Sequence, residues 1–417
     1  MAVFITPDQL QVGLYVQLDL RWVDHPFGFN SFKIKNADQV RALRQLGLDK
    51  LRYDPARSSA RPLPPPSHPA PKPVAVPRGE DPQIRAKQAR AVYLGQYRQA
   101  VARAEQALVS ASQRFRIITG KVLNRPAEAR EEAEQLVEQL AATFLAEPDA
   151  TIHAMGGQSA GDDIYYHGLN VTLLSMIMAK GLGYSADRGR TLGLGALFHD
   201  VGLMEVPTRV LRKTEPLTAA EYKLRQMHCE YGVELGKRMG LPGDVLEIIA
   251  QHHETMDGSG YPGQMRGEAI HPLARVVQVA NRYDSLCNPT EPAKAMSPHE
   301  ALSFMFAQQG AKHDPDMLRM LIRCLGVYPP GTVVHLSNGA TALVTSVNPA
   351  RPLKPTLVVY EPAVPREEAI VLDMDQETDV HLTHAIQPAE LPRAICDYLC
   401  MRRHVSYYFG ASAQGEA

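Results

Sequence analysis

Residues 192–203 read LGLGALFHDVGL, an apolar run that ends in a histidine and an aspartate. Leu192, Ala196 and His199 recur at helical spacing, so the His199-Asp200 pair ends the buried face of a predicted helix. Buried polar side chains without partners cost several kcal/mol, so the pair must meet other polar groups in the core. The stretch therefore predicts a helical core that encloses a polar site.

Further histidines end the apolar faces of three other predicted helices. A capping box, Thr218 to Glu221, predicts the start of the helix that carries His228. A helix from Leu273 onward places Asn281 and Asp284 on its inner face. Together with His199, the histidines at the ends of such faces are His167, His228, His252 and His253.

A shared metal centre is the simplest way to bury these groups. A single buried histidine is usually a satisfied core residue, but five on four helices need a common partner. Imidazole and carboxylate ligands suit iron, manganese or zinc better than calcium or magnesium alone. His252 and His253 lie about 100° apart on a helix, so both can ligate only if more than one metal binds. The residues thus predict a di- or trinuclear centre for metal-assisted hydrolysis of a phosphoester.

Outside this core, composition changes mark the domain boundaries. Residues 61–77 are rich in proline and form a semi-stiff spacer, while the Asn338-Gly339 turn predicts a hairpin near the C-terminus. We predict a small α+β N-terminal domain, a proline-rich linker, a helical connector, a helical core, a β-rich extension and a helical tail, at residues 1–55, 56–80, 81–150, 151–312, 313–385 and 386–417. The fold class is mainly α.

The composition excludes several classes of protein. The 417 residues carry 44 basic and 45 acidic side chains, so the net charge of -1 argues against binding to nucleic acid or to an anionic membrane over the whole chain. Neither a signal peptide nor a membrane span is evident. Five cysteines cannot form a disulfide framework, which favours a cytoplasmic protein.

The spacing of these motifs resembles that of the HD-GYP family within the HD superfamily. The resemblance covers about residues 150–310, and it rests on His167, on 198–202 (FHDVG), on His228, on 252–254 (HHE) and on 257–262 (DGSGYP). Residues 1–55 resemble the small domain that often precedes it. The resemblance implies an all-helical, metal-dependent phosphodiesterase that opens cyclic di-GMP to the linear dinucleotide or to GMP.

The resemblance also assigns roles to individual residues. It implies iron or manganese as the metals, with zinc as the alternative. His199 and Asp200 would be catalytic, and Lys294 would join the signature loop Gly260-Tyr261-Pro262 at the substrate. The implied metal ligands are His167, His199, Asp200, His228, His252, His253, the residue at position 281 and an acidic residue before His167, which is Asp163 or Asp162.

Three positions depart from the family pattern. Leu203 stands where the family has a lysine, and Asn281 replaces an aspartate that ligates metal. The loop 287–293 lacks the basic residues that would meet substrate phosphates. An amide carries no negative charge and bridges two cations poorly, although Asp284 nearby could partly substitute. These departures predict a metal site that is mostly present, with a weakened grip on phosphate.

Three functions stay open at this point. The first is an active cyclic di-GMP phosphodiesterase. The second is a catalytically poor protein that senses cyclic di-GMP or docks on a partner such as a diguanylate cyclase, and a homodimer is compatible with either. The third is an HD hydrolase of another nucleotide or cyclic dinucleotide. Retention of every histidine favours the first, whereas Asn281 and Leu203 favour the second.

Overall fold

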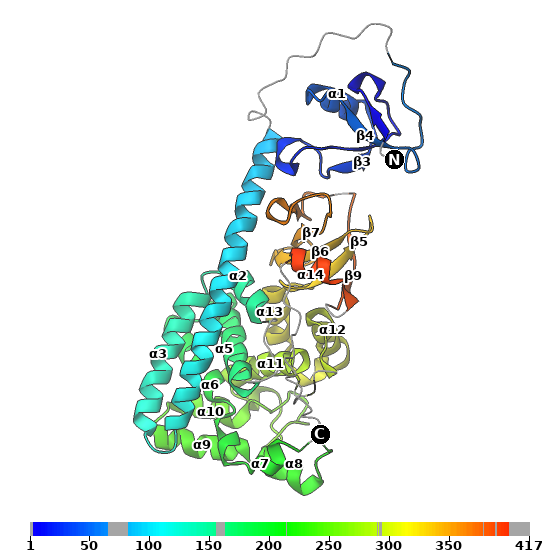
Figure 1. Ribbon diagram of the computed structural model, residues 1–417. Coiled ribbons are helices and arrows are strands. Elements are labelled where there is room, and N and C mark those ends of the chain that lie inside the picture. The colour runs from blue at the N-terminus through cyan, green and yellow to red at the C-terminus, as the bar shows by residue number, and fades with distance from the viewer. Residues whose placement is uncertain are drawn as a thin grey trace, which may run out of the picture.

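The computed structural model has a small N-terminal sheet, one long helix and a helical core, with a second sheet beside the long helix (Figure 1). It describes residues 3–65, 82–155, 163–213, 215–289, 291, 294–377, 379–387 and 390–399, without the side chains of Val23, Asp163 and Ile164. The predicted fold class, mainly α with a small α+β N-terminal part and a β-rich C-terminal part, is confirmed.

The N-terminal unit is a four-stranded antiparallel sheet covered by one helix. Its strands pair in the order β1-β4-β2-β3, and α1 (Ala37–Gln45) begins at Asn36, whose side chain caps the helix. The strands are β1 (Val3–Ile5), β2 (Tyr15–Gln17), β3 (Ser31–Lys33) and β4 (Leu51–Asp54). Residues 58–63 hydrogen-bond back onto this unit, at Gly13 and Gln9 among others. Residues 66–80 of the predicted linker lie outside the described residues.

Helix α2 (Pro82–Lys121) connects the N-terminal unit to the core. Its 40 residues extend about 60 Å at 1.5 Å per residue. The chain then turns, and α3 (Pro126–Phe144) starts with a proline in its first turn, where the missing N–H costs nothing. This break at Pro126 lets α2 and α3 pack side by side in the main hydrophobic cluster.

The helical core packs α5, α6, α9, α10 and α11 around that cluster. The helices are α4 (Pro148–Met155), α5 (Asp163–Gly181), α6 (Ala186–Phe198), α7 (Thr208–Leu211), α8 (Ala219–Gln226), α9 (His228–Met239), α10 (Gly243–Gln251), α11 (Pro272–Cys287), α12 (Pro298–Gln308) and α13 (Pro315–Leu325), with a 3-10 turn η3 (Val201–Glu205). The predicted capping box at Thr218 is present. One detail of the prediction is wrong: that helix ends at Gln226, and His228 begins α9 instead.

The C-terminal sheet is antiparallel, with strands in the order β8-β7-β6-β5-β9. They are β5 (Val333–Leu336), β6 (Thr341–Ser346), β7 (Thr356–Val359), β8 (Ile370–Asp373) and β9 (Leu382–Ile386). The β5–β6 hairpin turns at Gly339, whose φ of 82° suits glycine. The face of the sheet that carries Leu343 packs against Leu94 of α2 and against α14 (Arg393–Leu399).

A junction fastens the N-terminal unit to α2 and to the C-terminal sheet. Trp22 is buried among sheet residues such as Val334 and Leu336. Lys87 of α2 is also buried, and its Nζ donates hydrogen bonds to the carbonyl oxygens of Trp22 (2.9 Å), His25 (2.7 Å) and Phe27. Burial and the Lys87 charge lower the pKa of His25 to about 3, so His25 stays neutral.

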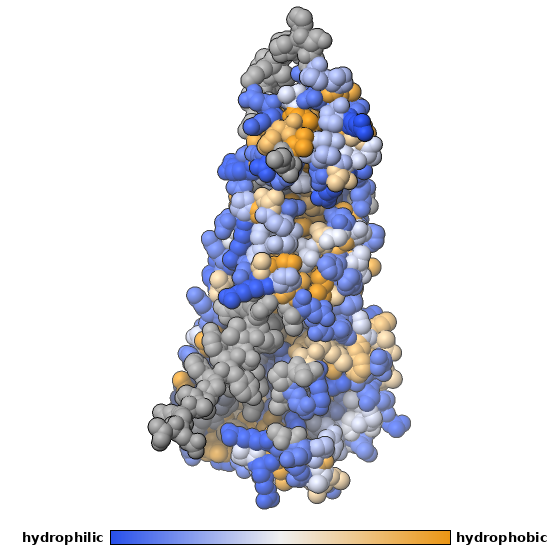
Figure 2. Space-filling model, turned by 45° about the vertical axis from the view of Figure 1, so that its right-hand side comes forward, coloured by the Kyte–Doolittle hydropathy of each residue, from blue (hydrophilic) through white to orange (hydrophobic). Residues whose placement is uncertain are grey.

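The surface is mainly hydrophilic on the face that Figure 2 presents, with small separate apolar patches. Among the described residues, no helix has the length and apolar character to cross a membrane. The cysteines that the structure describes, Cys229, Cys287, Cys324 and Cys396, are all free thiols.

We predict that Lys87→Met loosens this junction. The substitution leaves three buried carbonyl groups without their donor, and each such group costs about 1–3 kcal/mol. The midpoint temperature of thermal unfolding should fall by about 5 °C or more, as measured by the fluorescence of Trp22, the chain's one tryptophan. The exposed Lys237, which pairs with Glu234, provides the control Lys237→Met, with a shift near zero. Equal shifts in the two variants would contradict the role of Lys87.

Candidate metal centre

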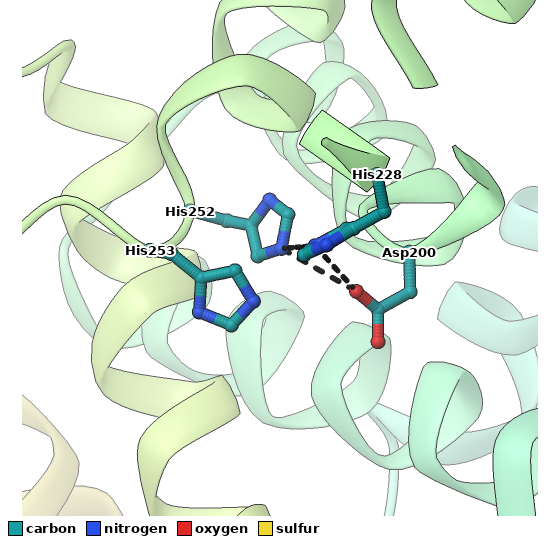
Figure 3. Close-up of side chains that lie close together, drawn as sticks. All are labelled: Asp200, His228, His252 and His253. Carbon is teal, nitrogen blue, oxygen red and sulfur yellow. Dashed lines mark hydrogen bonds and ion pairs between the residues drawn. The ribbon is translucent and has the colours of Figure 1, made fainter. Parts of the chain in front are cut away.

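The polar side chains predicted to meet in the core lie at helix ends. His199 and His252 directly follow the last residues of α6 and α10, His228 begins α9, and His167 lies near the start of α5. Figure 3 shows His228 and His252 directed toward the Asp200 carboxylate, with His253 beside them. The tertiary fold thus brings together all five predicted histidines and Asp200.

Gly202 lets η3 approach α9 closely enough to form this cluster. A Cβ added at Gly202 would lie 1.9 Å from the His228 carbonyl oxygen and 2.4 Å from the Gly232 nitrogen. Both are backbone atoms that cannot move aside. The glycine after the His-Asp pair is therefore needed to hold Asp200 against His228.

Three of the histidines have their protonation pattern fixed by the backbone. In each, Nδ1 faces the carbonyl oxygen three residues earlier, a group that helix ends leave without a partner. A carbonyl oxygen only accepts hydrogen bonds, so Nδ1 carries the proton and Nε2 is the atom available to a ligand. The pairs are His199 with Ala196 (2.6 Å), His228 with Arg225 (2.7 Å) and His252 with Ile249 (2.9 Å).

The Nε2 atoms converge on one carboxylate. Their distances to the nearer Asp200 oxygen are 3.3 Å for His228, 3.4 Å for His199, 3.4 Å for His252 and 3.9 Å for His167. The Nε2 atoms of His228 and His252 are also only 3.2 Å apart, and that of His199 is buried without a hydrogen-bond partner among the described residues. Facing lone pairs around a carboxylate are the arrangement that a divalent cation satisfies, so the residues fit a metal.

Asp200 is common to two groups of ligand atoms. One group joins Asp200 to His228, His252 and His253, and the other joins it to His167 and His199, with ligand atoms within 4.8 Å of one another in each. A carboxylate shared in this way can bridge two metal ions. The prediction that His252 and His253 can both ligate only if more than one metal binds rests on a helical placement that the structure does not have. Because α10 ends at Gln251, both histidines lie in a turn and face the same group.

Electrostatics in the cluster follow from one half-buried carboxylate among several imidazoles. Burial opposes the charge of Asp200, but the surrounding histidines outweigh it and hold its pKa well below the ordinary value. Burial also opposes the charge of His228, yet Asp200 raises that pKa to about 10. Burial lowers the pKa of His252 to about 4 and that of His253 well below its usual range. These two therefore remain neutral, the form that binds metal.

His167 is oriented by a carboxylate of its own. Its Nδ1 lies 2.7 Å from Asp284, whose other oxygen accepts hydrogen bonds from Asn170 (2.9 Å) and Asn288 (2.8 Å). Burial disfavours a charge on His167, but Asp284 and Asp200 outweigh it and raise its pKa. Asp284 thus positions a ligand, as carboxylates commonly do behind metal-bound histidines. Both of its oxygens are engaged, so the structure does not support its expected substitution for the missing ligand at position 281.

Asn281 lies beside His167 and is buried, with its Oδ1 accepting from Ser285 at 3.3 Å. The structure therefore places position 281 at the rim of the cluster, where the resemblance implies a ligand. The side chain of Asp163 and all of Asp162 lie outside the described residues. Leu203 is half-buried in η3, one turn beyond Asp200.

The signature loop folds back onto the cluster. A Cβ on Gly260 would come within 2.5 Å of the His253 carbonyl oxygen, and the Tyr261 ring stacks on the His253 ring with centroids 4.5 Å apart. Pro262 follows a cis peptide bond. Lys294, by contrast, is exposed and pairs with Glu291 at 2.9 Å, and no contact with the cluster is recorded for it among the described residues.

Sequence reasoning left two supporting residues without a role. Buried Glu254 accepts hydrogen bonds from the backbone nitrogens of Gly263 and Met265 (2.9 Å), which shapes the signature loop. Its position directly after His252-His253 was the available signal. Asn170 lies three residues after His167, and that helical spacing could have identified it as a neighbour.

Comparison with known proteins places this geometry in context. Residues 133–317 match the HD domain family, and residues 3–133 match a domain of unknown function, DUF3391. A cyclic di-GMP phosphodiesterase of Pseudomonas aeruginosa is 28% identical over 392 residues, which cover 92% of this chain and 91% of that protein.

Two further relatives are similar over shorter stretches. The cyclic di-GMP phosphodiesterase response regulator RpfG of Xanthomonas campestris is 35% identical over 149 residues, or 35% of this chain and 39% of that protein. The 3′3′-cGAMP-specific phosphodiesterase 2 of Vibrio cholerae is 30% identical over 158 residues, or 37% and 30% of the two chains. Similarity over nearly the whole chain is thus found with the first relative, and similarity over about a third with the other two.

We predict that the protein purified without air binds about one equivalent or more of iron, manganese or zinc. His199→Ala combined with Asp200→Ala should reduce the bound metal at least about tenfold, because the first removes one Nε2 and the second removes the shared carboxylate. Elemental analysis measures the content. The matched control is His299→Ala, since His299 bonds only to the Val327 carbonyl and the Tyr328 ring in the described structure. Absence of transition metal after anaerobic reconstitution would contradict the assignment.

Proposed function

The chain belongs to the HD-GYP family of HD-domain proteins, and on this basis we propose that it is a metal-dependent phosphodiesterase that hydrolyses cyclic di-GMP. The observation that carries the proposal is the convergence of imidazole Nε2 atoms on the Asp200 carboxylate. Similarity along nearly the whole chain to a protein named for this activity supports the choice of substrate. A role in second-messenger signalling and a cytoplasmic location belong to the same proposal, which the free thiols support.

The proposed metal ligands divide between two ions. His228, His252 and His253 would hold one, His167 and His199 would hold the other, and Asp200 would serve both. Iron or manganese suits this mixture of imidazole and carboxylate, with zinc as the alternative. When bound, such metals polarise a phosphoryl oxygen and lower the pKa of a metal-bound water molecule to near neutrality. Asp163, at the start of α5, is the proposed acidic ligand that completes the second group.

The chain's own residues prepare the site for a phosphodiester. The backbone carbonyls of α6, α10 and the α8–α9 turn accept from the Nδ1 atoms of His199, His252 and His228, so that the Nε2 atom of each of these three rings is directed at Asp200. His199 and Asp200 then hold the reacting centre in place. Tyr261, kept protonated because burial raises its pKa, covers His253 and presents the edge of the Gly260-Tyr261-Pro262 loop to the substrate.

Two positions reduce the expected turnover. Asn281 supplies no charge at the edge of the cluster, and Leu203 supplies no cation for a phosphate. Lys294 is the proposed basic contact, but its charge is shared with Glu291. These observations favour a second candidate function, in which the protein binds cyclic di-GMP and responds to it, or docks on a diguanylate cyclase, with little hydrolysis.

We predict that the metal-loaded protein opens cyclic di-GMP slowly and prefers it to 3′3′-cGAMP. Chromatography of each dinucleotide with equal enzyme measures the rates, and the linear dinucleotide or GMP is the expected product. His199→Ala should lose the activity, while His299→Ala should keep it. Faster opening of 3′3′-cGAMP would assign the site to the other substrate. Tight binding of cyclic di-GMP by every variant, without formation of the linear dinucleotide or GMP, would indicate that the site senses the dinucleotide.

We further predict that Asn281→Asp raises the metal content toward about two equivalents and raises turnover by about tenfold or more. A carboxylate there adds one negative charge beside His167 and can share in holding two cations. Addition of Leu203→Lys should increase the gain, since it restores a cation for phosphate. Asn338→Asp, in the β5–β6 turn, is the control with the same charge change and no expected effect. Fast hydrolysis by the natural sequence, without a gain in Asn281→Asp, would show that the site is already complete.

A further inference from the structure

A cavity of about 420 Å³ lies away from the metal centre, between α2, the C-terminal sheet and α14. Figure 1 shows α2 passing beside this sheet on its way to the helical core. The volume lies within the range of about 300–1,000 Å³ that small-molecule sites occupy. None of the proposed metal ligands lines it. It is therefore a separate space, walled on one side by the domain of unknown function.

Part of the cavity wall is apolar. Leu94 and Val101 project from one face of α2, and the opposite walls are formed by Leu343 of β6, Val358 of β7 and Leu399 of α14. All five side chains are buried. An apolar body placed against these five side chains would lose its contact with water.

One polar group in the wall lacks a hydrogen-bond partner. Arg98 lines the cavity, and its Nη2 atom is buried without an acceptor in the described part of the chain. A guanidinium N–H shielded from water without an acceptor is costly, so a ligand oxygen here would be strongly favoured. An anionic oxygen suits this position best, because it matches both the hydrogen bond and the charge.

The other polar groups of the wall are engaged. Tyr97 and His153 hydrogen-bond to each other at 2.8 Å, and burial lowers the pKa of His153 to about 4, so it is neutral. Asp397 pairs with Arg393 at 3.7 Å. Glu105 and Arg366 also have interaction partners. Among the described residues, Arg98 is thus the group in the wall that still needs an acceptor.

We propose that this cavity binds a small amphipathic anion, with its acidic head on Arg98 and its apolar body between α2 and strands β6 and β7. The ligand class follows from one donor that lacks an acceptor among the described residues, set beside an apolar wall in a space of limited volume. A ligand without a charged head leaves Arg98 unpaired, and one without an apolar body leaves the walls uncovered.

The same helix connects the cavity to the metal centre. Val101 and Phe115 are 14 residues apart on α2, about 21 Å along its axis. Phe115 packs against Gly168, the neighbour of His167, and against Phe198, the neighbour of His199. A ligand that shifts or stiffens α2 thus acts on residues adjacent to two metal ligands. This consequence rests on the proposed function, whereas binding in the cavity does not.

Calorimetric titration of the full chain with decanoate tests the proposal. We expect saturable binding of one decanoate, with binding at least tenfold weaker for acetate, which lacks the apolar body, and for decanol, which lacks the charge. Arg98→Gln should weaken decanoate binding by about 10- to 100-fold, the range expected for a lost charge-assisted hydrogen bond. Val101→Trp should fill the cavity and abolish binding. Arg103→Gln, on the same helix and paired with Glu147, should bind normally.

Thermal melting of each variant without ligand checks that it folds, and Arg98→Gln keeps the test valid should Val101→Trp not fold. Absence of saturable decanoate binding by the natural chain overturns the proposal, as does equal binding by Arg98→Gln and Arg103→Gln. A change of cyclic di-GMP hydrolysis on adding decanoate is expected in the natural chain and not in Arg98→Gln. Failure of hydrolysis alone affects the proposed function and leaves the binding result to decide on the cavity.

Discussion

The carboxylate of Asp200 is the group around which the core is arranged. Four imidazoles from separate elements approach it through Nε2, between 3.3 and 3.9 Å. So many buried imidazoles are tolerable only because each has a second partner at Nδ1, a carbonyl oxygen or a carboxylate. The helix ends supply these carbonyls, since the last turn of a helix leaves them unpaired. Helix termination and ligand orientation are therefore one structural feature.

Small residues and one long helix keep this arrangement in place. Gly202 allows the backbone carrying Asp200 to lie against α9, and Gly168 makes room for the Phe115 ring of α2. Through α2 the core is continuous with the N-terminal unit, whose loop is held by buried Lys87. The domain of unknown function, which ends in α3, thus contacts the rest of the molecule in three places. These are the junction around Trp22 and Lys87, the cavity between α2 and α14, and the packing of α2 behind the metal centre.

The residues around position 281 decide whether its departure from the family pattern is compensated. An aspartate at 284 could be read as a replacement for the carboxylate missing at 281, because both lie on the inner face of α11. In the structure, Asp284 is committed to His167, Asn170 and Asn288, so the charge missing at 281 is not replaced there. The cluster has its histidines and its shared carboxylate, while the negative charge available to balance two cations is reduced. The site can therefore retain metal and dinucleotide binding while its rate of hydrolysis is low.

Much of this could be predicted from the sequence, because helical periodicity and the identity of polar residues are local properties. The 3.6-residue spacing of apolar side chains indicated the core helices, the capping box at Thr218 indicated a helix start, and the burial cost of five histidines indicated a metal. Other features depended on tertiary structure. The exact residue at which α10 ends decides whether His252 and His253 point in different directions. Because α10 ends at Gln251, just before them, both side chains face the same group of ligand atoms. The partners of Asp284, the sharing of Asp200 between two groups and the cavity beside Arg98 each join residues from distant parts of the chain. Local spacing carries no information about such contacts, since they form only when separate elements pack against one another.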